Sequence, residues 1–169
     1  YKVGSELFTA AGPGVVRELR RAGCDVFLDL KFHDIPNTVS RGVASACALG
    51  VRLVTVHATG GDAMLRAAVA AAGDQVGCGV LAVTVLTSLT EAEVASAWGR
   101  GGESVDLAAE VLRLSALAHE AGAHGIVCSG QEAGAVRDRF GDGLAVLVPG
   151  VRLAGGATHD QRRVVTPRA

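Results

Sequence analysis

The chain has 169 residues, of which 49% are hydrophobic and 20% are charged, and its formal net charge is −1. This composition is typical of one globular domain, and it offers no basic surface for a nucleic-acid backbone or an anionic membrane, so we expect neither partner. No apolar run approaches the roughly 20 residues that span a bilayer, and the first residues lack a signal-peptide pattern, so we expect a cytoplasmic protein.

The four cysteines are scattered along the chain and form no Cys-x-x-Cys pair. The sequence therefore predicts neither a zinc site nor a redox motif, and we expect Cys24, Cys47, Cys78 and Cys128 to be small core residues. Disulfide pairing stays open at this stage, although an Ala- and Gly-rich chain of this size should not need it. Histidines and carboxylates likewise show no metal-ligand spacing, and we expect no metal.

Strand-like and helical patterns alternate through the first half of the chain. Runs rich in Val and Leu predict strands, and Ala-rich patterns predict the helices between them. The strands are expected at residues 26–29, 53–57 and 79–87, and the helices at residues 14–22, 39–49 and 62–72. Each of these helices is followed by a glycine, as helix C-termini often are.

The same alternation continues in the second half. Thr90 and Glu93 resemble a capping box that begins a short helix. Longer helices and further strands follow, with helices expected at residues 104–121 and 131–140 and strands at residues 125–128 and 144–148. Together with a strand near Lys2, the sequence predicts six strands.

Parallel strands with helical crossovers can close into a barrel or lie in an open sheet, and periodicity does not distinguish the two. No Gly-x-Gly-x-x-Gly opens a helix after a strand, so dinucleotide binding has poor support. We favour a barrel because polar residues recur at the carboxyl ends of the expected strands, where barrel active sites assemble. These residues are Lys2, Asp29, Lys31, His57, Thr87, Ser88, Ser129, Pro149 and Arg152.

Charged residues interrupt the most buried-looking strand. Asp29 and Lys31 alternate with apolar residues, so their side chains share one face, with Phe27 below them. Burying either ion alone would cost several kcal/mol, so they must neutralise each other or face a charged ligand. A structural ion pair is the simpler interpretation of Asp-x-Lys alone, but Asp34 and Pro36 place a third charge and a strand stop at the same junction.

The ten residues from Asp29 to Thr38, Asp-Leu-Lys-Phe-His-Asp-Ile-Pro-Asn-Thr, resemble the signature of the orotidine 5'-phosphate decarboxylase family in its bacterial form. The resemblance implies a (β/α)8 TIM barrel that converts orotidine 5'-phosphate (OMP) to UMP and CO2 in de novo pyrimidine biosynthesis, without metal or cofactor. It implies catalytic roles for an alternating network of Lys2, Asp29, Lys31 and Asp34, with Lys31 as proton donor to C6 of the pyrimidine.

Other residues gain binding roles by the same resemblance. It implies a homodimer in which Asp34, with Ile35 and Thr38, completes the neighbouring subunit's pocket. Thr87 and Ser88 resemble the strand end that recognises the pyrimidine. The segment Val-Pro-Gly-Val-Arg that contains Pro149 and Arg152, with Gln161 after it, resembles a phosphate-gripping loop.

Six expected strands are fewer than the eight of the family's barrel. We therefore expect residues 1–169 to form a single barrel domain that lacks the first and last strands. The aspartate that the family has on its first strand and the Gly-Arg pair that it has on its last strand are then also absent. The activity of this chain therefore stays open. One alternative is a related sugar-phosphate decarboxylase or aldolase, which would usually recruit magnesium. Another is a non-catalytic fragment. We assign no catalytic role to His33 or His57, since such histidines are more often packing residues.

Overall fold

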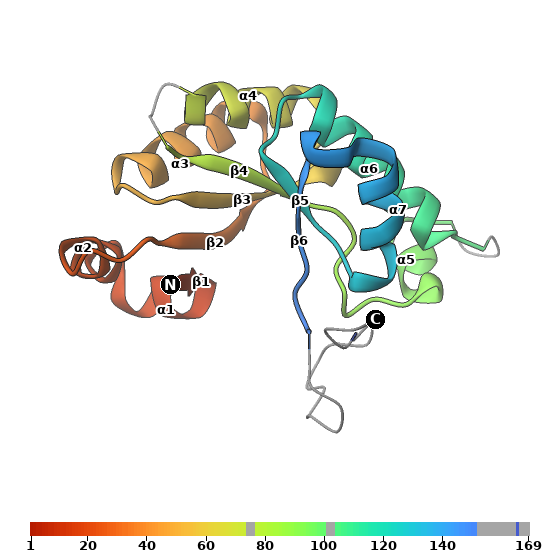
Figure 1. The fold of residues 1–169 in the computed structure, drawn as a ribbon, viewed down its shortest axis with the longest axis horizontal. Coiled ribbons are helices and arrows are strands. Elements are labelled where there is room, and N and C mark those ends of the chain that lie inside the picture. Colours follow the sequence, from red (N-terminus) through yellow and green to blue (C-terminus); the bar gives the residue numbers. More distant parts are fainter. Residues whose placement is uncertain (74–76, 101–103, 152–164, 166–169) are drawn as a thin grey trace.

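The computed structural model describes residues 1–73, 77–100, 104–151 and 165. Within these residues the sheet has six parallel strands, and their order in space follows their order in the sequence (Figure 1). This confirms the six predicted strands. They are β1 (Lys2–Gly4), β2 (Phe27–Phe32), β3 (Leu53–His57), β4 (Gly79–Val83), β5 (Gly125–Val127) and β6 (Ala145–Leu147).

Helices connect successive strands, and α3, α4, α6 and α7 lie along the outer side of the curved sheet (Figure 1). Sequential parallel strands with helices outside form the arrangement of a (β/α)8 barrel, and the described residues make a six-stranded part of it. In the part of the chain that the structure describes, no helix has the length and apolar character needed to cross a membrane. The helices are α1 (Ser5–Ala11), α2 (Gly14–Arg21), α3 (Pro36–Ala48), α4 (Asp62–Gly73), α5 (Glu91–Ala97), α6 (Leu107–Glu120) and α7 (Gly130–Phe140), with 3-10 turns at Ala58–Gly60 and Gly141–Gly143.

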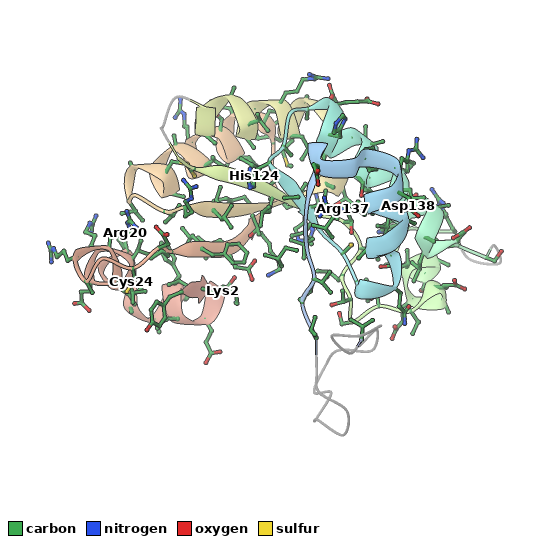
Figure 2. All side chains as sticks on the ribbon, viewed as in Figure 1. Lys2, Arg20, Cys24, His124, Arg137 and Asp138 are labelled. Carbon is green, nitrogen blue, oxygen red and sulfur yellow. A yellow bond between two sulfur atoms is a disulfide. The ribbon has the colours of Figure 1, made fainter. Side chains whose placement is uncertain are left out.

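Alternation along each strand divides the apolar residues between two faces. Val54 and Val56 of β3 are fully buried in the main core, together with Leu65 of α4 and Leu114 of α6. A smaller cluster of Leu81, Val83 and Val127 lies on the other face, with Phe27 and Leu147 packed against it. Side chains fill the space between helices and sheet (Figure 2). The helices therefore cover the outer face of the sheet, and a binding site can form on its inner face.

Several element boundaries differ from those predicted. Strand β2 continues to Phe32, because Phe32 pairs with Val56 after an irregularity in the register. Strand β4 ends at Val83, four residues early, because the chain leaves the sheet and turns, with the Leu89 N–H donating to the Leu86 carbonyl. Helix α3 begins three residues early, at Pro36, which suits the first helical position.

The capping box of Thr90 and Glu93 is confirmed: the Thr90 side chain accepts from the Glu93 N–H, and the Glu93 carboxylate accepts from the Thr90 N–H. A second capping box, between Ser129 and Glu132, begins α7 and was missed by the sequence analysis. The buried Ser129 hydroxyl thus satisfies helix donors at the end of β5.

The cysteines differ from expectation. Cys47 at the end of α3 forms a disulfide with Cys78, the residue before β4, across a Cα–Cα distance of 5.9 Å. Neither Cys24 nor Cys128 takes part in a disulfide, and of these two only Cys128 is buried. Parallel pairing of β3 with β4 brings the two distant segments together, and no local pattern in the sequence indicates this proximity.

Reduction of the disulfide should destabilise the chain. The bond closes a loop with a sequence separation of 31 residues, and its loss should lower the free energy of unfolding by about 3–4 kcal/mol because the unfolded chain gains freedom. Urea unfolding with and without reductant measures this difference. A Cys24→Ala variant should keep the reductant effect, and a Cys47→Ala variant should lose it. Equal unfolding midpoints for the oxidised and reduced protein would contradict the bond.

Candidate active site

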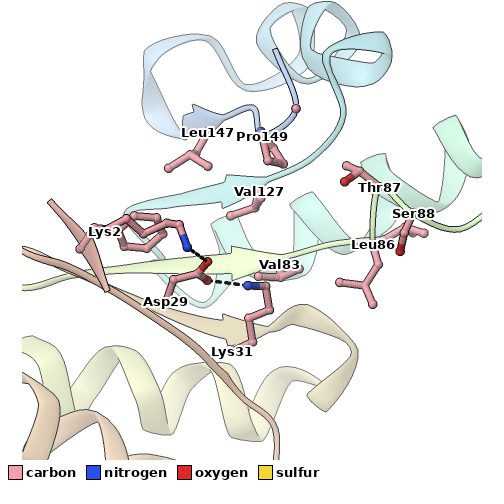
Figure 3. A pocket seen from close by; sticks show the side chains of 13 residues that line it. Lys2, Asp29, Lys31, Val83, Leu86, Thr87, Ser88, Val127, Leu147 and Pro149 are labelled. Atoms are coloured by element: carbon pink, nitrogen blue, oxygen red, sulfur yellow. Dashed lines mark hydrogen bonds and ion pairs between the residues drawn. The ribbon is translucent and has the colours of Figure 1, made fainter. Parts of the chain in front are cut away.

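A cavity of about 420 Å³ opens on the inner face of the sheet. Strands β1, β2, β4, β5 and β6 and the segments after them contribute its walls (Figure 3). Apolar side chains form much of the lining, and charged and hydroxyl groups stand at separate places on it. The lining residues are Lys2, Phe27, Asp29, Lys31, Val83, Val85, Leu86, Thr87, Ser88, Val127, Leu147, Pro149 and Gly150.

The charged part of the cavity is a chain of two ion pairs around one carboxylate. Lys2 Nζ lies 3.3 Å from Asp29 Oδ2, and Lys31 Nζ lies 2.8 Å from Asp29 Oδ1 (Figure 3). The Asp29 side chain is only 13% exposed, whereas those of Lys31 and Lys2 are 37% and 56% exposed. Two ammonium groups against one carboxylate leave a net charge of +1 (2 − 1), which suits an anionic ligand.

Lys2 occupies a different strand position from that predicted. It is the first residue of β1 and pairs with Phe27, whereas Gly4 pairs with Asp29. The Lys2 side chain therefore runs along the sheet to reach Asp29. Gly4 leaves room for it, since a Cβ at Gly4 would lie 3.1 Å from Lys2 Nζ.

Opposing effects act on the Asp29 carboxyl. Burial raises its pKa, but the hydrogen bond and charge of Lys31, the Thr55 hydroxyl and the charge of Lys2 together outweigh burial and lower the pKa below 3.8. Asp29 is therefore ionised at neutral pH, where it holds both lysines.

Lys31 has an unusual backbone. Among described residues other than glycine it alone has a positive φ, of 53°. Such a conformation costs an L-residue about 1–2 kcal/mol. It falls within the irregular pairing of β2 with β3, and the Lys31 N–H donates to the Thr55 hydroxyl over 2.9 Å. The strain is therefore held in place by a side chain of the next strand.

Hydroxyl groups stand on the far side of the cavity. Thr87 is buried and Ser88 is half-buried, in the segment after β4, and Figure 3 shows them across from the lysines. Pro149 and Gly150 follow β6 at the rim. Six predicted site residues thus line one cavity: Lys2, Asp29, Lys31, Thr87, Ser88 and Pro149. The predicted phosphate ligands Arg152 and Gln161 lie outside the described residues.

Asp34, Ile35 and Thr38 are exposed and do not line this cavity. Asp34 Oδ1 accepts the Ile35 N–H over 2.6 Å, and within the described ranges Asp34 makes no ion pair. Ile35 is 67% exposed, which is unusual for so apolar a side chain. The three side chains therefore present polar and apolar groups on the surface.

His33 and His57 do not line the cavity. The rings of His33 and His57 are 5.3 Å apart, and burial, followed by the charges of His33 and Lys31, lowers the pKa of His57 below 6.5. No cluster of histidine, cysteine, aspartate and glutamate suited to a metal occurs in residues 1–73, 77–100, 104–151 and 165.

Sequence reasoning missed two groups of site residues. The apolar walls, such as Val85 and Leu147, follow from strand alternation but carry no motif. Thr55 hydrogen-bonds both Asp29 and Lys31, and a threonine inside a Val-rich strand gives no signal of that role.

Comparison with known proteins identifies the family. Residues 1–169 match the model of the Orotidine 5'-phosphate decarboxylase / HUMPS family. A protein of Anaeromyxobacter dehalogenans named orotidine 5'-phosphate decarboxylase is 56% identical over 166 residues, which cover 98% of this chain and 70% of that protein. One of the same name from Nitrosococcus oceani is 49% identical over 168 residues, which cover 99% and 71%.

A solved structure of a protein with the same name also resembles this chain in fold. The crystal structure of orotidine 5'-phosphate decarboxylase from Lactobacillus acidophilus has 38% sequence identity and a TM-score of 0.79, over 89% of this chain and 68% of that one. The signature at the end of β2, the shared fold and the identities of 56% and 49% in the two relatives all agree. This chain belongs to the Orotidine 5'-phosphate decarboxylase / HUMPS family.

Proposed function

We propose that this chain decarboxylates OMP to UMP and CO2. The observation that carries the proposal is the Lys2–Asp29–Lys31 chain of ion pairs, which faces a cavity with hydroxyl groups on its opposite wall. Two relatives that are named for this activity, and that are 56% and 49% identical to the chain over the aligned residues, support it.

The chemistry requires electrostatic help at one carbon. When the bond from C6 to the carboxylate breaks, its electron pair stays in an sp² orbital at C6. The ring's π system cannot delocalise this pair. A fixed ammonium group beside C6 stabilises this charge: at 4 Å and an effective dielectric constant of 20 the interaction is about 4 kcal/mol, or roughly a thousandfold in rate. Lys31 Nζ, held on Asp29 Oδ1, supplies the charge and then donates its proton to C6.

Asp29 has a second role in this proposal. It keeps Lys31 oriented, and its carboxylate would lie next to the substrate carboxylate that leaves and repel it. The net positive charge of the cluster accepts an anion despite that repulsion, because two ammonium groups flank the single carboxylate. Thr87 and Ser88 offer donors and acceptors for the amide edge of the pyrimidine. Pro149, with Arg152 and Gln161, would hold the phosphate.

The proposed assembly is a homodimer. Asp34, Ile35 and Thr38 are exposed and lie off the cavity of their own chain, as expected of residues that complete a neighbour's pocket. We further propose that residues 1–169 act as one barrel domain in the cytoplasm.

Loss of the Lys31 ammonium should abolish turnover. Lys31→Ala should reduce kcat on OMP at least about a thousandfold, since it removes both the charge and the proton donor. Substrate loss followed by ultraviolet absorbance, with and without a chelator, measures this. The exposed Arg66→Ala variant should keep wild-type turnover. Substantial turnover by Lys31→Ala would refute the proton-donor role, and activity that needs a divalent metal would favour the sugar-phosphate alternative.

A pocket shared between subunits should allow complementation. Asp34→Asn and Lys31→Ala proteins should each be inactive, but a mixture that exchanges subunits should regain roughly a quarter of wild-type activity, because half the dimers are mixed and each has one intact pocket. Mass spectrometry of tagged subunits verifies the exchange. Mixed dimers without activity would show that Asp34 does not act on the partner's pocket.

The Asp29 ion pairs should make stability depend on pH. The folded pKa lies below the unfolded value of 3.8, so the unfolded chain binds a proton more readily in acid. The stability contributed by Asp29 is therefore present above about pH 4 and is lost as pH falls through the folded pKa. Urea unfolding of the wild type and of Asp29→Asn should show a free-energy difference that shrinks over this range. A difference that does not change with pH would count against the ion pairs.

A further inference from the structure

We propose that Thr55 is a positioning residue whose hydroxyl fixes both ends of Lys31 and thereby sets the rate of the chemical step. This inference rests on the proposed function. It is carried by two hydrogen bonds of the Thr55 hydroxyl, the strained backbone of Lys31 and the irregular register between β2 and β3. Thr55 itself lies outside the sequence signature.

Thr55 sits at the middle of β3 and is fully buried. Its hydroxyl accepts the Lys31 N–H over 2.9 Å and donates to Asp29 Oδ1 over 3.0 Å. The direction of both bonds is fixed, because a backbone N–H can only donate and the hydroxyl hydrogen is then left for the carboxylate. A buried hydroxyl that both accepts and donates a hydrogen bond is held in one orientation.

The strand register gives Thr55 this position. Leu28 pairs with Val54 and Phe32 pairs with Val56, so three residues of β2, from Asp29 to Lys31, stand opposite the single residue Thr55. Such an irregularity removes ladder hydrogen bonds and redirects side chains. The Thr55 hydroxyl replaces the missing acceptor for Lys31, whose φ of 53° is otherwise unfavourable.

One hydroxyl therefore acts on the lysine twice. It holds the Lys31 backbone directly, and it holds the Asp29 oxygen that lies 2.8 Å from Lys31 Nζ. The Lys31 side chain spans these two fixed points. If the hydroxyl is removed, the backbone loses the bond that maintains its conformation and Asp29 loses one of the donors that orient it. A displacement of about 1 Å at a reacting group can cost roughly a hundredfold in rate.

The test compares two substitutions at Thr55 with one elsewhere. Thr55→Val keeps the shape and removes the hydroxyl, and Thr55→Ser keeps the hydroxyl. Thr84→Val is the matched control, because Thr84 is equally buried and donates to the Val127 carbonyl, away from the charged residues. Thr55→Val should lower kcat on OMP about 10- to 100-fold with much less change in KM. Thr55→Ser should restore most of kcat, and Thr84→Val should stay within a few-fold of wild type.

A second readout separates positioning from general damage. The Thr55 hydroxyl lowers the pKa of Asp29, so Thr55→Val should move the Asp29 titration, followed by carboxyl ¹³C NMR, to higher pH, whereas Thr84→Val should not. This measurement needs no activity. If the wild type fails to decarboxylate OMP, the proposed function fails while the titration still tests the role of Thr55. Wild-type kcat with an unmoved titration in Thr55→Val would overturn the inference, as would Thr55→Ser being as impaired as Thr55→Val.

Discussion

The site depends on one carboxylate held between two ammonium groups. Asp29 is mostly buried and ionised, a state that would be costly without Lys2 on one oxygen and Lys31 and Thr55 on the other. Lys2 comes from β1, Lys31 from β2 and Thr55 from β3, so the complete set of contacts around Asp29 forms only when the first three strands are in register. The cluster in turn leaves one positive charge unmatched, which suits an anionic substrate.

The two faces of the sheet contribute differently to holding this cluster in place. Outward residues such as Val54 and Val56 pack under the helices, which makes β3 a rigid support. Between them, Thr55 points inward to the charges. Because side chains alternate strictly along a strand, the same pentapeptide provides both the core and the positioning hydroxyl. Packing and chemistry therefore share residues that are adjacent in sequence but opposite in direction.

The cavity combines strong electrostatics with an apolar lining. Phe27, Val83 and Val127 line the cavity together with the charged groups, and such apolar walls lower the local dielectric constant, which strengthens the charge interactions in the site. The half-exposed lysines remain accessible from the mouth. Such a site suits a reaction whose main difficulty is a localised charge, and the family to which the chain belongs is named for one.

The sequence by itself determined the six strands, the face shared by Phe27, Asp29 and Lys31, and the family, because these follow from local periodicity and from a contiguous motif. Only the tertiary structure decided that Thr55 lies opposite Lys31, that Lys31 has a positive φ, and that Cys47 pairs with Cys78. The physical reason is the same in each case. These features depend on how strands distant in the chain are aligned, and an alignment between strands leaves no periodic trace in either one.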